Sequence, residues 1–174
     1  IWVVTFKSLT FSRRCTMIES NREIKKPSEK REIMPRFEAS ALRGYCVSDL
    51  TGSGVERSCA EAVADALIDA ELTGVSTHGV SRLAVYMQRM DAGVMSRENN
   101  IRIVRESTST LVVDAGNSLG AAAAKFAMER CIAKAKETGC CFASVHSSNH
   151  FGTAAYYTRL AAAQDMIGFA CTNL

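Results

Sequence analysis

Two histidine-containing segments carry the residue types best suited to chemistry in this chain. The first holds Thr77, His78 and Arg82, and the second spans residues 147–152 with His150 inside it. Both are small, polar and glycine-containing, a composition typical of turns that bring backbone and side chain to a ligand. Histidine is also the side chain whose charge changes most readily near neutral pH. The two segments therefore indicate proton-transfer chemistry on a small polar ligand.

The first segment places three functional side chains at intervals of four residues. His78, Arg82 and Tyr86 follow this spacing, which puts side chains on one face of a helix. An arginine presents a planar fork that fits a carboxylate through two hydrogen bonds, and its charge favours the neutral form of a nearby histidine. The alternative is an ordinary solvated face of an amphipathic helix, and this alternative is favoured when the segment is considered by itself.

The second segment is expected to follow a strand and to begin a helix at His150. Ligand sites in open α/β sheets gather at the carboxyl ends of strands. Ser147, Ser148 and Asn149 can donate and accept hydrogen bonds, and Gly152 permits close approach of a ligand. One hypothesis is a histidine that acts as a general acid and base or polarises a substrate. The other is a helix-capping turn whose histidine only satisfies a backbone group, and the residues support both hypotheses equally.

Two weaker patterns were weighed for a phosphate and for a metal ion. Residues 116–120 open a helix after a strand, which could receive a phosphate, but they do not match GxGxxG and a plain helix-entry turn is favoured. His146 and His150 are four residues apart, yet a strand-to-turn transition separates them. Because no carboxylate or cysteine stands at ligand spacing nearby, no metal site is predicted.

The composition indicates a globular domain with a basic appendage. The chain has 174 residues, of which 47% are hydrophobic and 22% charged. Residues 1–36 hold 9 basic and 4 acidic side chains, whereas the remainder holds 12 and 14. We predict a flexible basic tail over residues 1–36, which Pro27 and Pro35 interrupt. Nucleic-acid binding by the rest of the chain is not expected.

Cysteine usage and hydropathy bear on the compartment. The chain has seven cysteines and no CxxC pair, which favours buried thiols in a reducing, cytoplasmic environment. No apolar run approaches the ~20 residues of a membrane-spanning helix. Residues 1–4 are apolar but too short for a signal peptide. No membrane partner is therefore expected.

Hydrophobic periodicity predicts a helical segment followed by alternating strands and helices. Helices are predicted over residues 39–47, 56–72 and 79–91, within a helical N-terminal segment at 37–95, with a loop at 51–54. A β-hairpin is predicted over 101–105 and 111–114, then a helix at 118–137, a strand at 140–145, a helix at 150–163 and a strand at 166–171. This order is typical of an α/β sheet with right-handed crossovers. Parallel strands need cover on both faces, so we expect further sequence or an obligate partner.

Apolar spacing also predicts which helix faces are buried. In the helix at 56–72 the predicted buried face comprises Cys59, Val63, Ala66, Leu67 and Ala70. In the helix at 79–91 the predicted apolar seam comprises Val80, Leu83, Met87 and Met90. His78, Arg82 and Arg89 fall on the opposite side of that helix, with Tyr86 on its flank. The helix at 79–91 is therefore expected to bury one side and to present polar side chains on the other.

Two sequence blocks resemble those of a known enzyme family. GVSTHGVSRL at residues 74–83 with the tyrosine at 86, and SNHFG at 148–152 with later Tyr-Tyr and Thr-Asn pairs, resemble the type 2 malate/L-lactate dehydrogenase family of sulfolactate dehydrogenase-like oxidoreductases. The resemblance covers residues 37–173. It implies hydride transfer between NAD or NADP and a 2-hydroxy acid or its 2-oxo acid, malate-like or lactate-like. It also implies a non-Rossmann cofactor fold and homodimers.

The resemblance implies roles for individual residues. His78 and His150 fall on the family's two catalytic histidines, the candidates for acid and base. We favour His150 as the proton donor and acceptor, with His78 as a substrate or charge-relay partner. Arg82 falls on the arginine that grips the substrate carboxylate. The other implied contacts are substrate binding by Tyr86 and Thr77 and cofactor binding by Asn149, Gly152 and Asn173. Thr77 departs from the serine usual in the family, but its hydroxyl is retained.

The family's longer chains imply that this sequence holds only part of the enzyme. Residues 96–174 are then the first part of a truncated NAD(P)-binding α/β domain, and much of the nucleotide-binding surface follows later in the family. A rival hypothesis is a non-catalytic fragment that acts only in dimerisation. A second rival is a cyclic imino-acid reductase, because the family also contains such enzymes.

Overall fold

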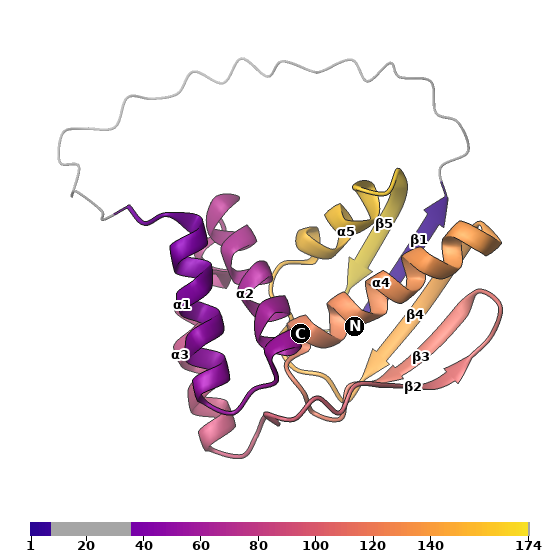
Figure 1. The fold of residues 1–174 in the computed structure, drawn as a ribbon. Coiled ribbons are helices and arrows are strands. Elements are labelled where there is room, and N and C mark those ends of the chain that lie inside the picture. The colour runs from indigo at the N-terminus through magenta and orange to yellow at the C-terminus, as the bar shows by residue number, and fades with distance from the viewer. Residues whose placement is uncertain (8–35, 174) are drawn as a thin grey trace, which may run out of the picture.

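The computed structural model describes residues 1–7 and 36–173 (Figure 1). Its helices are α1 (Ala39–Gly52), α2 (Arg57–Leu72), α3 (Ser81–Asp91), α4 (Gly120–Thr138) and α5 (Ala154–Ala162), with a 3-10 turn η1 (Ser76–His78) before α3. Its strands are β1 (Trp2–Lys7), β2 (Arg102–Glu106), β3 (Thr110–Asp114), β4 (Cys140–His146) and β5 (Met166–Cys171). The predicted helical segment and the alternating strands and helices that follow it are confirmed.

The strands form one sheet in the order β2-β3-β4-β1-β5. The predicted hairpin is present as the antiparallel pair β2 and β3. β3 and β4 are parallel and joined through α4, and their register places Asp114 opposite His146. The chain therefore has the mixed α/β fold that the alternating pattern predicted, and the ends of β3 and β4 meet at the same edge of the sheet.

The sequence did not predict the central strand β1. The tail prediction for residues 1–36 is wrong at Trp2–Lys7, which lie antiparallel between β4 and β5. Residues 8–35 lie outside the described residues. Side chains of β1 alternate in burial, with Val3 and Thr5 fully buried and Trp2 and Phe6 exposed. This period-two pattern in β-branched and aromatic residues is a strand signal, but the long-range pairing that stabilises it cannot be read from a seven-residue run.

Helix α4 packs closely on the sheet because much of its inward face consists of small side chains. Ala123, Ala127, Cys131 and Ala135 are fully buried against the strands. Small residues let a helix approach a sheet closely, and long ones at these positions would hold it away. The helix ends at Gly139, whose φ of 88° is left-handed. β4 begins directly afterwards, so the end of α4 fixes where the strand that leads to His150 starts.

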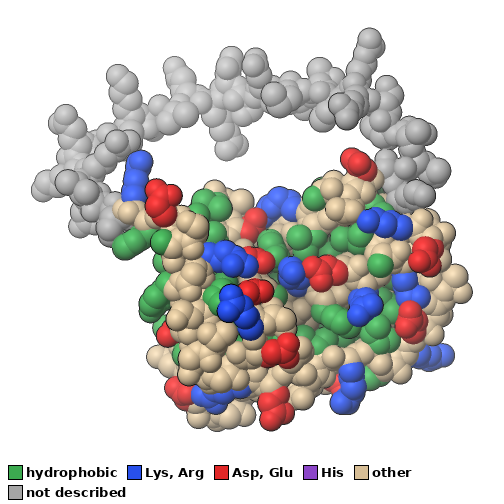
Figure 2. Space-filling view, in the orientation of Figure 1, with side chains coloured by type: hydrophobic (Ala, Val, Ile, Leu, Met, Phe, Trp, Pro, Cys, Tyr) green, Lys and Arg blue, Asp and Glu red, His purple; other side chains and the backbone are tan. Residues whose placement is uncertain are grey.

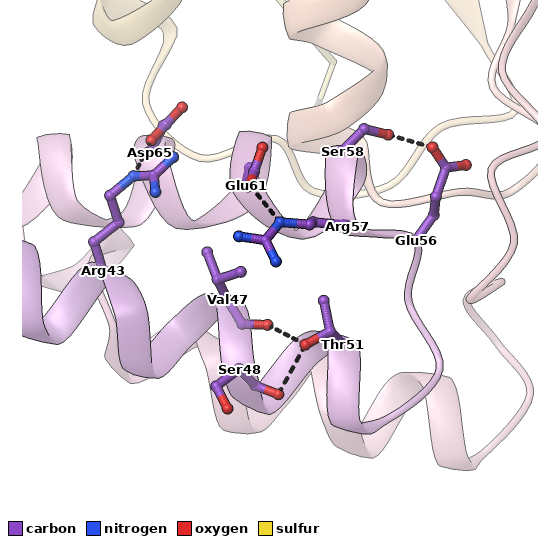
Figure 3. A network of polar contacts seen from close by, with 9 residues as sticks. All are labelled: Arg43, Val47, Ser48, Thr51, Glu56, Arg57, Ser58, Glu61 and Asp65. Atoms are coloured by element: carbon purple, nitrogen blue, oxygen red, sulfur yellow. Dashed lines mark hydrogen bonds and ion pairs between the residues drawn. The ribbon is translucent and has the colours of Figure 1, made fainter.

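Helices α1 and α2 pack side by side next to the sheet layer (Figure 1). The Arg43 guanidinium donates to Asp65 at 2.6 Å across the pair, and Arg57 donates to Glu61 at 2.9 Å within α2 (Figure 3). All five residues of the predicted α2 face are buried, which confirms that face. The predicted loop at 51–54 is partly wrong, because α1 continues to Gly52.

Two local predictions near the histidines need correction. His150 does not begin a helix: it lies in a loop, and α5 begins at Ala154. The left-handed φ values of Ser147 (50°) and Gly152 (82°) interrupt helical geometry there. Tyr86 does not lie on a polar flank. Its side chain is 2% exposed and is part of the hydrophobic core. Val80 and Met87 of the predicted seam are only partly buried.

Charge on the drawn face of the molecule is mixed. Lys and Arg side chains alternate there with Asp and Glu, and no field of a single sign stands out (Figure 2). Among the described helices, none combines the length and the apolarity that crossing a bilayer requires. The described residues also contain no group of three or more His, Cys, Asp or Glu that could hold a metal ion.

Candidate functional site

Three segments that are distant in sequence enclose one cavity. It has a volume of about 430 Å³ and is lined by His78 and Arg89, by residues 148–152 of the β4–α5 loop, and by Thr172 and Asn173 after β5. This volume falls within the range of small-molecule sites. The carboxyl ends of β4 and β5 thus meet the helical segment here, as ligand sites in α/β sheets commonly do.

His150 is held by contacts to both of its aromatic neighbours. The Tyr86 hydroxyl lies 2.8 Å from Nδ1 of His150, within hydrogen-bond distance. The His78 ring stacks on the His150 ring with centroids 5.3 Å apart and an interplanar angle of 29°. Among the described residues, the His150 ring makes one hydrogen bond, through Nδ1. Its Nε2 therefore stays available to a ligand in the cavity. The buried tyrosine therefore orients the imidazole and leaves one nitrogen for chemistry.

The segment before α3 is a turn that carries His78 and is held by several hydrogen bonds. The Thr77 hydroxyl lies 3.0 Å from Nδ1 of His78, and the Arg82 Nε donates to the Thr77 carbonyl at 2.7 Å. The Glu71 carboxylate accepts from the Val80 backbone N–H at 2.8 Å, a favourable place for a negative charge beside the start of α3. These bonds hold the His78 backbone between the end of α2 and the first turn of α3.

Burial and neighbouring cations set the protonation of the two central side chains. Burial, and after it the positive charges of Arg82, His78 and Arg89, lower the pKa of His150 below its ordinary value of 6.5. Burial raises the pKa of Tyr86 to about 12. At neutral pH the imidazole is therefore neutral and the phenol keeps its proton. A neutral imidazole is the form that can accept a proton from a substrate.

The loop after His150 is anchored to α5 by Tyr157. Its hydroxyl donates a hydrogen bond to the Phe151 carbonyl, and the two rings stack with centroids 5.2 Å apart. Tyr157 is fully buried. Among the described residues, the buried hydroxyl of Ser148, which lines the cavity, has no hydrogen-bond partner. Buried polar groups are usually paired, so this hydroxyl is available to a bound molecule.

The structure brings most of the sequence-predicted site residues together. His78, Asn149, His150, Gly152 and Asn173 line the cavity. The Tyr86 hydroxyl is hydrogen-bonded to His150 at the wall of this cavity. The Arg82 side chain donates a hydrogen bond to the Thr77 carbonyl beside His78. The third histidine, His146, instead lies 3.7 Å from the Asp114 carboxylate on the far side of the loop. The fold thus places His78 and His150 at the cavity and His146 outside it.

The sequence assigned no specific contact to four residues that line this cavity. They are Arg89, Ser148, Phe151 and Thr172. Arg89 was placed on the polar side of its helix with His78 and Arg82, and that shared face was the signal that could have assigned it. Ser148, Phe151 and Thr172 belong to the second of the two sequence blocks described above, but only the fold shows that they meet at one cavity.

Comparison with known proteins gives one consistent result. The sequence profile of the malate/L-lactate dehydrogenase family matches residues 37–174. The chain is 41% identical over 120 residues to L-sulfolactate dehydrogenase of Methanocaldococcus jannaschii, covering 69% of this chain and 35% of that protein. It is 38% identical over 138 residues to malate dehydrogenase of Pyrococcus horikoshii, covering 79% and 38%.

Solved structures agree with the sequence comparison. The structure of the Pyrococcus horikoshii malate dehydrogenase superposes with a TM-score of 0.72 at 36% identity, covering 75% of this chain and 37% of that one. The sulfolactate dehydrogenase of Methanocaldococcus jannaschii gives a TM-score of 0.71 at 35% identity, covering 74% and 37%. The chain therefore spans well under half the length of these relatives. It belongs to the malate/L-lactate dehydrogenase family.

Proposed function

We propose that the protein transfers a hydride between a nicotinamide cofactor, NAD or NADP, and a 2-hydroxy acid or its 2-oxo acid. The substrate class is malate-like or lactate-like. The observation that carries this proposal is His150, a half-buried neutral imidazole fixed by Tyr86 and stacked on His78 at the wall of the cavity. The names of the relatives, malate dehydrogenase and L-sulfolactate dehydrogenase, support the same substrate class.

His150 would exchange the proton of the reaction. In the oxidation of a 2-hydroxy acid, the free ring nitrogen of His150 accepts the proton of the hydroxyl group. The hydride leaves from the carbon that bears this hydroxyl. In the reduction, the imidazolium returns that proton to the carbonyl oxygen. Nδ1 keeps its hydrogen bond to Tyr86 in both directions, because a phenol can donate or accept. Arg82, beside His78, would bind the carboxylate that all these acids share.

The residues around the cavity fit the reacting end of a nicotinamide cofactor. When bound, the nicotinamide ring supplies or accepts the hydride. The unpaired buried hydroxyl of Ser148 could bond to a carboxamide, and Asn173 and Gly152 line the same wall. A cavity of about 430 Å³ accommodates a small acid and a ring of this size but not a whole dinucleotide. Cofactor binding by Asn149, Gly152 and Asn173 is therefore proposed for the nicotinamide end.

Assembly and location are part of the same proposal. We propose a homodimer, as the family resemblance implies, and the exposed apolar side chains of Trp2, Phe142 and Phe169 on the sheet support a need for further contacts. A cytoplasmic location is supported by the described cysteines, which are free thiols and include the buried Cys46, Cys59, Cys131 and Cys141.

The test is turnover by the full-length protein. Oxaloacetate, pyruvate and other 2-oxo acids are supplied with NADH or NADPH, and cofactor oxidation is followed by absorbance. His150→Ala is expected to lower kcat by roughly 10²-fold or more if His150 is the general acid. His146→Ala is the matched control, because this histidine lies outside the cavity, and it should keep a normal rate.

Three outcomes would count against the proposal. Absence of turnover with every 2-oxo acid would overturn it. Reduction of cyclic imines without reduction of oxo acids would favour the imino-acid reductase. A near-normal rate for His150→Ala together with a large loss for His78→Ala would move the proton-transfer role to His78.

A further inference from the structure

The turn between β3 and α4 contacts the segment after α3 and the β4–α5 loop, but it does not line the cavity. Within this turn Asn117 adopts a left-handed conformation, with φ of 62°. Asparagine occupies this region more readily than most other residues. The sequence left two readings for this turn, a phosphate site or plain helix entry. In the structure the turn leads into α4 at Gly120, as the favoured prediction required, and it also packs against two other loops.

The Asn117 amide bridges these two loops. Its Nδ2 donates to the Val94 carbonyl at 3.1 Å, and its Oδ1 accepts from Asn149 Nδ2 at 3.0 Å. Val94 follows α3, the helix that carries Tyr86, and Asn149 precedes His150. One side chain therefore connects the two segments whose separation sets the contact between the tyrosine and the histidine.

The backbone of Asn117 bonds to the same two loops. Its N–H donates to the Ser147 carbonyl at 2.8 Å, and its carbonyl accepts from the Ser96 N–H at 2.8 Å. Asn149 Nδ2 also lies 3.0 Å from the carbonyls of Asn117 and Ser118. The backbone bonds depend on the left-handed φ, whereas the bridge depends on the amide. A substitution can therefore remove the bridge and keep the backbone bonds.

The His150 loop also rests directly on the start of α4. A Cβ on Gly120 would lie 2.1 Å from the Asn149 carbonyl oxygen and 2.5 Å from that of His150. No real side chain makes such contacts, so the loop is seated where only glycine fits. The first residue of α4 thus limits movement of the loop by close contact, and Asn117 holds the same loop by hydrogen bonds.

We propose that Asn117 is a positioning residue, whose amide holds the His150 loop against the end of α3 and so keeps His150 at hydrogen-bond distance from Tyr86. This inference rests on the function proposed above. Catalytic groups must be held within a fraction of an ångström, and a displacement of about 1 Å can cost about 10²-fold in rate. Asn117 touches neither proposed reactant and acts through Asn149.

Asn117→Gly tests the amide without disturbing the turn. Glycine adopts a φ of 62° without strain, so the backbone bonds remain. In the full-length protein we expect kcat to fall between about 10-fold and about 100-fold. KM for the 2-oxo acid should change by less than about 2-fold, because the binding groups stay in place. The pH limb of kcat/KM assigned to His150 should move upward, because a looser loop hydrates the imidazole and relieves its burial.

Two further variants separate positioning from stability. Asn117→Asp keeps the acceptor for Asn149 and should recover part of the lost kcat. Asn99→Gly alters an exposed asparagine between α3 and β2 that does not line the cavity, and it should behave as the parent protein. A normal kcat and pH profile for Asn117→Gly would overturn the proposal. A loss that only follows the folded fraction, with an unmoved pH limb, would also overturn it.

A readout that needs no turnover keeps this inference separate from the proposed function. The ring protons of the histidines are titrated by NMR in the parent protein and in Asn117→Gly. The pKa of His150 should rise in Asn117→Gly and should stay unchanged in the control variant Asn99→Gly. If no 2-oxo acid is reduced but the His150 pKa responds, the proposed function fails and the positioning role stands. An unchanged His150 pKa overturns the positioning role whatever the activity.

Discussion

At the scale of single residues, the site depends on an imidazole kept neutral by its surroundings. Burial first, and then Arg82, His78 and Arg89, lower the pKa of His150, and Tyr86 presents a phenol that keeps its proton. The arginine that would bind the substrate carboxylate thus also prepares the base that would remove the substrate proton. One cation serves both purposes because the two groups must lie close together around a small acid.

A pH profile should detect this arrangement. Oxidation of the hydroxy acid needs neutral His150, so kcat/KM should rise with pH through the histidine's lowered pKa, giving a limb below pH 6.5. Arg82→Gln removes a positive charge that opposes protonation, so the limb should move to higher pH. The amplitude should also fall, because the carboxylate loses its partner. The measurement is kcat/KM between about pH 4 and about pH 9, and the pH at which the limb lies shows whether the charge of Arg82 acts on His150.

The matched control for this measurement is Arg105→Gln. Arg105 is exposed on β2 and is not among the groups that shift the pKa of His150. Its removal should leave both the limb and the amplitude unchanged. If Arg82→Gln lowers the rate without moving the limb, the charge of Arg82 does not set the protonation of His150.

At the scale of elements, the β4–α5 loop is held in place by the helix that follows it. The Tyr157 hydroxyl is the hydrogen-bond donor to the buried Phe151 carbonyl, next to His150. Tyr157→Phe leaves this carbonyl unpaired, which is expected to cost about 1–3 kcal/mol of unfolding free energy. Urea unfolding measures this change. Tyr45→Phe, at an exposed tyrosine of α1, should stay within about 0.5 kcal/mol of the parent protein, and equal effects of the two substitutions would contradict the assigned role of Tyr157.

Most elements could be predicted from the sequence because their stabilising patterns are local. The apolar face of α2 and the glycine after α4 mark those helices within a window of a few turns. Each histidine segment alone also fits an ordinary helix face or capping turn, but the two together, in this order, match the sequence blocks of one enzyme family. The burial of Tyr86 could not be predicted, because its partner His150 is 64 residues away and only the packed fold brings them together. The same holds for Asn117, whose partners lie in two other loops.

At the scale of the whole molecule, the helices of residues 36–173 that pack on the sheet, α4 and α5, cover one of its faces. The outward side chains of the central and edge strands are large and apolar, including Trp2, Phe6, Phe142, Ile167 and Phe169, which are between 37% and 63% exposed. The alternating strand and helix pattern predicts cover on both faces, since parallel strands are normally buried on both sides. The same apolar run that makes β1 a good central strand therefore also exposes two aromatic rings.

An exposed apolar face of this kind should promote association of the 174-residue chain. Contiguous apolar patches larger than a few hundred Å² are uncommon on monomers and mark contact surfaces. β5 lies at the edge of the sheet, where unpaired backbone groups add to the tendency. We expect sedimentation velocity to show concentration-dependent association of this chain, with binding of a hydrophobic dye. The double substitution Ile167→Lys and Phe169→Lys should reduce both, because each lysine must be desolvated on contact. Leu72→Lys, at an exposed leucine that ends α2, is the matched control and should change neither. Equal association of the parent chain and the double variant would show that this face does not drive contact, and the sheet would then be stable with one face in water.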